Sequence, residues 1–164
     1  MTSAEASKPG QPHRIRFNEQ YFPGDLWSVG EARINDLLVV VRFRTGLPPA
    51  PARQVNENLV IISWPYTGIE NGMPNEADKQ STNAFEEAIE RGFDDSALAV
   101  QVACLTGNHQ KEWRFYTHDV EAFLDAFNAC LAGHPVYPIQ LHMYKDPEWN
   151  ALAGLQPRRT DQLH

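Results

Sequence analysis

The chain has 164 residues, of which 42% are hydrophobic, and a formal net charge of −7. This length and composition suit one globular domain with a core of its own. No stretch approaches the roughly twenty consecutive apolar residues that span a bilayer, and residues 1–20 lack the apolar run of a secretory signal. We therefore expect no membrane association and a cytoplasmic protein.

The charge is unevenly distributed along the chain. Residues 1–56 contain seven Lys or Arg against five Asp or Glu, whereas residues 57–164 contain seven against sixteen. An acidic body repels phosphate backbones, so we expect no direct nucleic-acid binding. A basic protein partner fits this charge distribution better.

The expected domain occupies residues 21–153, between a disordered N-terminal tail (1–20) and a flexible C-terminal tail (154–164). The two cysteines, Cys104 and Cys130, fall on the apolar stripes of expected elements, where a thiol behaves as a small hydrophobe. We therefore expect neither a disulfide framework nor a cysteine-based metal site.

The expected domain begins with a β-hairpin, whose strands 25–33 and 36–44 are joined around Asn35. The second strand is apolar on one face and turns basic at its end. Residues 46–58 contain three prolines, and we expect a connector there that is neither a helix nor a central strand.

From residue 58 onward the pattern becomes strand, helix, strand, strand, helix, strand. The expected strands are 59–66, 96–106, 110–118 and 137–145, with a hairpin turn at Gly107-Asn108, and the expected helices are 76–92 and 119–132. We expect Ala84 in the buried stripe of the first helix and Met143 on the buried face of the last strand. A short turn or helix begins at Asp146.

This βαββαβ order predicts an α+β fold of the ferredoxin-like plan, with an antiparallel sheet and two helices on one face. The preceding hairpin could extend the sheet edge or fold over the open face. Large aromatic side chains are expected to anchor the core: Trp113, Phe115, Tyr137 and Trp149.

Familiar catalytic motifs are missing from the sequence. It contains no Gly-x-Ser-x-Gly elbow, no Ser-x-x-Lys, no P-loop and no Gly-x-Gly-x-x-Gly. Its six histidines form no pair at metal-ligand spacing, so we expect no metal and no cofactor. One polar set would share the sheet face opposite the helices: Glu112, Arg114, Tyr116, His118 and His142. It could bind a ligand or perform acid–base chemistry, but such mixtures are common on sheet surfaces without function.

The two expected helices are both acidic. The first carries five acids against two bases, and the second carries three acids and no base. Candidate binding residues on and after the first helix are Glu86, Glu87, Glu90, Asp94 and Asp95. The charge could simply aid solubility, or it could steer a basic partner toward the helical side.

Several short motifs occur in a fixed order: ISWPY, NGMP, EWRFY, FNACL, YPI and DPEW. On these motifs the chain resembles the bacterial domain-of-unknown-function family 695 over roughly residues 25–152. The resemblance implies a ferredoxin-like domain that is sometimes joined to a domain similar to a protein regulator of ribonuclease activity. No catalytic residues are established for that family, so the association implies binding or regulation and assigns no active site.

Taken together, these observations predict a non-catalytic, protein-binding or regulatory module. It could be an acidic inhibitor or immunity-type protein that acts on a basic nuclease or toxin through its helical side. The alternative is a small-ligand-binding protein or hydrolase that uses the polar sheet face. The sequence assigns no oligomeric state.

Overall fold

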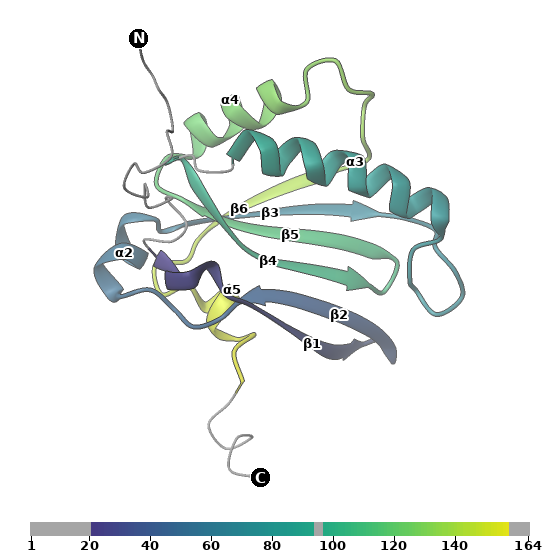
Figure 1. The fold of residues 1–164 in the computed structure, drawn as a ribbon, viewed down its shortest axis with the longest axis horizontal. Coiled ribbons are helices and arrows are strands. Elements are labelled where there is room, and N and C mark those ends of the chain that lie inside the picture. Colours follow the sequence, from purple (N-terminus) through teal and green to yellow (C-terminus); the bar gives the residue numbers. More distant parts are fainter. Residues whose placement is uncertain (1–20, 94–96, 158–164) are drawn as a thin grey trace, which may run out of the picture.

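The structure, a computed structural model, describes residues 21–93 and 97–157 (Figure 1). The expected tail at 1–20, the last seven residues of the chain, and the candidate residues Asp94 and Asp95 lie outside these ranges. Among the described residues, no helix is both long enough and apolar enough to cross a membrane.

The described residues form one six-stranded antiparallel sheet with the strand order β1-β2-β4-β5-β3-β6. The strands are β1 (Trp27–Ile34), β2 (Leu37–Arg44), β3 (Asn58–Pro65), β4 (Ala99–Gly107), β5 (Gln110–Thr117) and β6 (Gln140–Lys145). The helices are α2 (Ala50–Val55), α3 (Glu76–Phe93), α4 (Val120–Cys130) and α5 (Asn150–Ala153), preceded by the single turn η1 (Pro23–Asp25).

Four of the strands and two of the helices follow the expected βαββαβ plan. The chain runs β3, α3, β4, β5, α4, β6, and α3 and α4 lie side by side on one face of the sheet (Figure 1). Asp119 caps α4 by accepting a hydrogen bond from the backbone N–H of Ala122. An aromatic core centred on Phe85 fills the space between these helices and the sheet, so the α+β prediction is confirmed.

The N-terminal hairpin extends the sheet edge, because β2 pairs antiparallel with β4. Both hairpin turns, Asn35-Asp36 and Asn108-His109, have left-handed backbone angles, which Asn and Asp tolerate better than most residues. The second turn lies one residue later than Gly107-Asn108. Beyond β4, the hairpin reaches past the helix layer (Figure 1).

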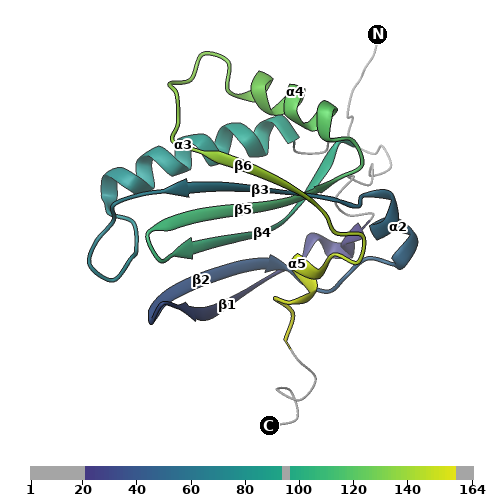
Figure 2. The same cartoon turned by 180° about the vertical axis from the view of Figure 1, so that it is seen from behind.

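The C-terminal segment covers one end of the opposite face of the sheet (Figure 2), where it packs against a second apolar cluster from β2, β4 and β5. Trp149 and Leu152 are fully buried there against this cluster, which includes Phe22 and Tyr116. Of the two places that the sequence left open for the hairpin, it takes the sheet edge, and α5 lies on the opposite face. Contacts continue to Gln156, whose side chain accepts from the Gly46 N–H and donates to the Arg44 carbonyl.

Three local expectations were wrong. Helix α2 forms within the proline-containing connector because Pro51 lies in its first turn, where an N–H has no intrahelical partner. Ala84 is exposed on α3, since Phe85, Ala88 and Ile89 complete the buried stripe. Met143 is 43% exposed because β6 is an edge strand. Of the four expected core anchors, Trp113, Phe115 and Trp149 are buried and Tyr137 packs partly buried against the core.

Candidate functional site

On the sheet face opposite α3 and α4, several polar side chains already form hydrogen bonds with other residues of the chain. Tyr116 is buried, donates its hydroxyl to Asp146 at 2.6 Å, and stacks on Trp149 with a ring-centroid distance of 4.0 Å. Arg114 donates to Glu112 at 2.6 Å and to the Ala151 carbonyl at 2.6 Å. The bonds from Arg114 and Tyr116 connect β5 to the C-terminal segment, and Glu112 pairs with Arg114. Glu112, Arg114 and Tyr116 therefore stabilise the fold.

The two histidines of this set are exposed; His142 lies on β6, and His118 lies outside the strands. His142 on β6 is opposite Ile61, which is in turn opposite Arg114, so β3 separates the histidine from β5. His118 follows the last residue of β5. Within residues 21–93 and 97–157, no group of three His, Cys, Asp or Glu side chains could hold a metal ion. The structure brings Glu112 and Arg114 together but keeps both histidines apart from them.

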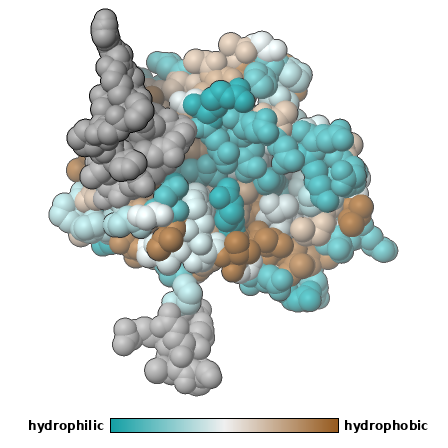
Figure 3. Space-filling model, in the orientation of Figure 1, coloured by the Kyte–Doolittle hydropathy of each residue, from teal (hydrophilic) through white to brown (hydrophobic). Residues whose placement is uncertain are grey.

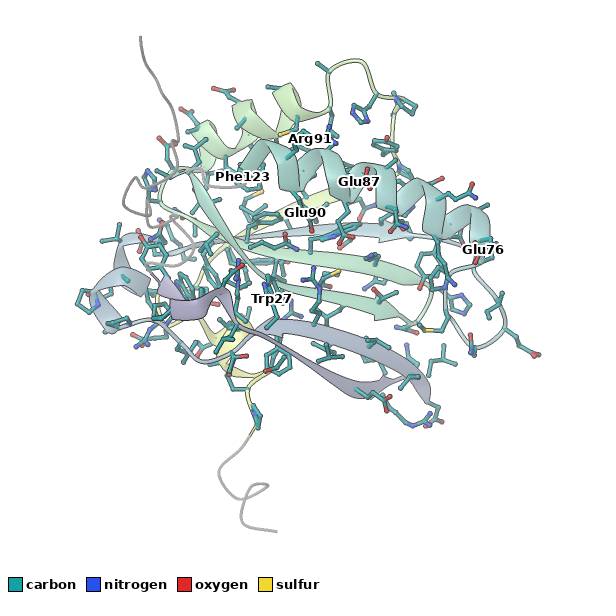
Figure 4. The ribbon with its side chains drawn as sticks, viewed as in Figure 1. Trp27, Glu76, Glu87, Glu90, Arg91 and Phe123 are labelled. Carbon is teal, nitrogen blue, oxygen red and sulfur yellow. The ribbon has the colours of Figure 1, made fainter. Side chains whose placement is uncertain are left out.

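The glutamates of α3 divide into an inner and an outer set. Glu86 is inner: its carboxylate accepts from the Trp113 indole N–H at 2.8 Å and lies 3.5 Å from the Lys111 ammonium, and its side chain is only 18% exposed. Glu87 and Glu90 are outer and exposed. Glu90 lies on the side of α3 that is nearer to Trp27 (Figure 4), and its carboxylate is 4.0 Å from the guanidinium of Arg42.

Glu87 and Glu90 line a groove of about 380 Å³ between α3 and the N-terminal hairpin. We call it the α3–hairpin groove. It exists because the sheet continues two strands beyond the helix layer, which leaves the helix-side face of β2 uncovered. Its other lining residues are Asp25, Trp27, Arg42, Arg44, Ile89, Arg91, Phe93, Ala99, Gln101 and Phe115. Figure 3 shows hydrophilic side chains over α3 and hydrophobic ones over the hairpin next to it.

Two arginines and a tryptophan make up one wall of this groove. The guanidinium carbons of Arg42 and Arg44 lie 4.3 and 4.2 Å from the centroid of the Trp27 ring, within cation–π distance. Arg44 is buried, donates to the Gln101 carbonyl at 3.0 Å and forms an ion pair with Asp25. Burial lowers the pKa of the Arg44 guanidinium, and the nearby Arg42 charge adds to this effect while Asp25 opposes it.

Sequence reasoning missed Trp27, Arg42, Arg44 and Gln101 as site residues. The available signal was the basic end of the hairpin strand 36–44, where Arg42 and Arg44 are two residues apart and therefore share a face. That pattern could not show that the face would lie beside α3, because the pairing of β2 with β4 joins segments about sixty residues apart.

Neither cysteine is activated for nucleophilic attack. Burial raises the pKa of the Cys104 thiol to about 12, and burial also raises the pKa of Cys130. Both cysteines are free thiols. Cys104 lies under α3, with its sulfur 3.8 Å from a carboxylate oxygen of Glu86.

The arrangement of the groove, with cations on one wall and outer glutamates on the other, is suited to binding a charged or polar group.

Comparison with known proteins gives one family match. Residues 25–153 match a family that is described only as a family of unknown function, DUF695. No curated protein and no solved structure matches the chain. The matched range contains all six strands, both long helices and every residue that lines the α3–hairpin groove. The chain therefore belongs to the DUF695 family.

Proposed function

We propose that this protein is a non-catalytic, cytoplasmic binding module, and that a protein partner docks at the α3–hairpin groove. The observation that carries the proposal is the groove itself: about 380 Å³, with Arg42 and Trp27 on one wall and Glu87 and Glu90 on the other. Pockets of this size suit a protruding segment or a small group, and charges of both signs can orient it.

Exposed apolar side chains next to the groove support a protein as the partner. Leu26 is 59% exposed and Val29 is 70% exposed, and both lie on or beside β1, one of the two edge strands of the sheet. Apolar residues next to a polar cleft are typical of docking surfaces, where burial of apolar area supplies affinity and charges supply selectivity.

The exposed acidic residues of α3 and α4 support a partner that is basic overall. Glu76, Glu87 and Glu90 of α3 are exposed, as are Glu121 and Asp125 of α4. A surface dominated by one sign accelerates encounter with an oppositely charged protein. An inhibitor or immunity-type protein for a basic nuclease or toxin would use such a surface. The polar sheet face offers less support for a ligand site or a hydrolase, because Arg114 and Tyr116 are occupied by bonds within the chain.

The test is affinity purification from the native host with the wild-type chain and with the double variant Glu87→Lys/Glu90→Lys, followed by binding measurements with the purified partner. Reversing the two outer glutamates should weaken the complex at least about tenfold. Glu86 is not substituted in this experiment, because its carboxylate pairs with Lys111 and accepts a hydrogen bond from Trp113 inside the fold.

The matched control is Glu76→Lys/Glu121→Lys, which changes the net charge equally on exposed acids elsewhere on the helical side; Figure 4 shows Glu76 at the far end of α3. If the control retains the partner and the groove variant loses it, the groove is the docking site. Equal retention by both variants would reject the groove. Equal loss in both would point to steering by the whole acidic side and not to a localised site.

A further inference from the structure

Strand β1 forms one border of the sheet, and one of its sides has no strand beside it (Figure 1). In the part of the chain that the structure describes, β1 pairs only with β2. The Thr45 N–H donates to the Leu26 carbonyl at 3.2 Å, and bonded positions alternate with unbonded ones along an antiparallel pair. Counted from Leu26, Glu31 and Arg33 therefore direct their backbone N–H and C=O groups away from β2.

The side chains at this edge carry both signs of charge. Glu31 and Arg33 are exposed and lie two residues apart, so they share one face of β1. Arg33 donates one guanidinium N–H to the Asp36 carbonyl at 3.0 Å and has further donors to offer. No described residue forms an ion pair with Glu31. The other edge strand, β6, contains no acidic residue, so only β1 presents both signs.

We propose that a second copy of this chain pairs with β1, antiparallel and around a two-fold axis at Ala32. In this register Glu31 of each copy lies opposite Arg33 of the other, and the two residues exchange both of their backbone N–H···O bonds. The contact is separate from the proposed function, because residues 31–33 do not line the α3–hairpin groove.

Charge selects this register over its neighbours. Only positions with outward backbone groups form bonded pairs across the edge, so the permitted registers differ by a shift of two residues. Such a shift places Glu31 opposite Glu31 of the second copy in one direction, and Arg33 opposite Arg33 in the other. Like charges directly opposite each other destabilise strand pairing, whereas opposite charges stabilise it. Charged residues commonly protect an edge strand from pairing, but this spacing makes the edge of β1 complementary to itself.

The shape of the edge agrees with the charges. In the same register Gly30 lies opposite Ile34 of the second copy, and Ile34 is 42% exposed. The fold of one chain does not require a glycine there, because Gly30 has no positive φ and an added Cβ would lie 3.8 Å from the Phe43 ring, an ordinary contact. The missing side chain leaves room for Ile34 of the second copy, and its burial stabilises the pair.

The test is sedimentation equilibrium of the full chain at concentrations up to roughly 1 mM, which populate a small interface. The wild type should form a dimer. Glu31→Arg and Arg33→Glu each place like charges opposite each other in both symmetry-related pairs, and each should weaken the dimer by roughly tenfold or more. A monomeric wild type, an open-ended assembly, or unchanged association of both variants would overturn the proposal.

A mixture of the two variants separates complementarity from a general effect of charge or folding. In a mixed dimer the two arginines of one copy face the two glutamates of the other, so a one-to-one mixture should dimerise although each variant alone does not. The charge-matched control is Glu121→Arg on α4, which should leave the wild-type dimer unchanged. A mixture that stays monomeric, or equal weakening by Glu121→Arg, would overturn the proposal.

Disulfide formation tests the register. At the two-fold axis Ala32 faces Ala32 of the second copy in an unbonded pair, whose Cα atoms are about 4.5 Å apart, close enough for a disulfide. Ala32→Cys should therefore form a covalent dimer under mild oxidation at least about tenfold faster than Ile34→Cys, whose opposite residue is Gly30. Both variants carry Cys130→Ala, which removes the partly exposed native thiol. Equal rates would overturn the proposed pairing.

Discussion

The two faces of the sheet carry similar side chains in opposite situations. On the face where α5 lies, Tyr116 stacks on Trp149, and Arg114 and Tyr116 both have hydrogen-bond partners inside the chain. On the helix side, Arg42 and Gln101 lie beside Trp27, yet the groove remains and one buried donor is unpaired. Composition therefore does not separate a structural polar cluster from a candidate binding site. The cover separates them: α5 packs against Tyr116 and Arg114, whereas among the described residues the groove beside Arg42 is left open.

The largest effect that tests this comparison is expected from the two tryptophans. Trp149→Ala should lower the free energy of unfolding by about 3–5 kcal/mol, because a fully buried indole leaves a cavity over Tyr116. Trp27→Ala should cost roughly 1–2 kcal/mol, because that ring is half-buried and borders the groove. Denaturant unfolding of both variants measures the difference. Equal losses would mean that the groove wall is as important for folding as the α5 face.

The next effect concerns Asp146, which joins the sheet to α5. Its carboxylate accepts from the Tyr116 hydroxyl and from the backbone N–H groups of Asn150 and Ala151. Asp146→Ala leaves one buried and two partly buried donors unpaired and should lower the free energy of unfolding by about 2–4 kcal/mol. Tyr116→Phe removes only one of these bonds and should cost about 1 kcal/mol. A loss below that of Tyr116→Phe would show that water replaces the carboxylate and that the face is open.

An alkaline titration of stability tests how well the helix layer closes over the sheet beside the groove. The Cys104 pKa is raised by burial from 9.0 to about 12, so the folded state keeps the proton that the unfolded state releases. The stabilisation is fully present below pH 9 and is lost between pH 9 and about 12. The loss at pH 10 should be about 1.4 kcal/mol.

The control for that titration is the Cys104→Ala variant, whose free energy of unfolding should fall less between pH 9 and 10 than that of the wild type. Measurements are confined to this window because the raised pKa of Tyr66, about 12 through burial and the Asp78 charge, adds a similar loss above it. The same slope in wild type and Cys104→Ala would mean that water reaches the thiol under α3.

The smallest effect distinguishes the inner from the outer glutamates of α3. Glu86→Gln removes the ion pair with Lys111 and weakens the bond from Trp113, and it should cost about 1 kcal/mol. Glu87→Gln, on the exposed rim, should change the free energy of unfolding by less than about 0.5 kcal/mol. Thermal unfolding of both variants in low salt provides the measurement. A larger loss from Glu87→Gln would mean that the rim of the groove supports the fold.

Much of the architecture follows from local patterns. Alternating apolar residues marked the strands, 3.6-residue periodicity marked α3 and α4, and Asn35 and Asn108 marked turns with left-handed backbone angles. The prediction of which β6 residues are buried was less accurate, because the sequence does not show which strands lie at the edge of the sheet. Helix α2 was not expected, because proline breaks a helix in its interior, but Pro51 lies in the first turn, where proline is tolerated.

The candidate site was harder to predict than the fold. Glu86, Glu87 and Glu90 share a helix and look equivalent in the sequence, yet Glu86 is used by Lys111 and Trp113 while Glu87 and Glu90 line the groove. The difference arises from which side of α3 meets the sheet and where the helix layer ends. Both are long-range properties.

The sequence by itself determined the order of strands and helices, the acidic helical side and the DUF695 membership over residues 25–153. Only the tertiary structure decided that the hairpin extends the sheet past the helices, that α5 closes the opposite face, and that Arg42 and Gln101 line one groove. The physical reason is that propensity and periodicity act over a few residues, whereas strand pairing and satisfaction of buried polar groups depend on contacts between distant segments.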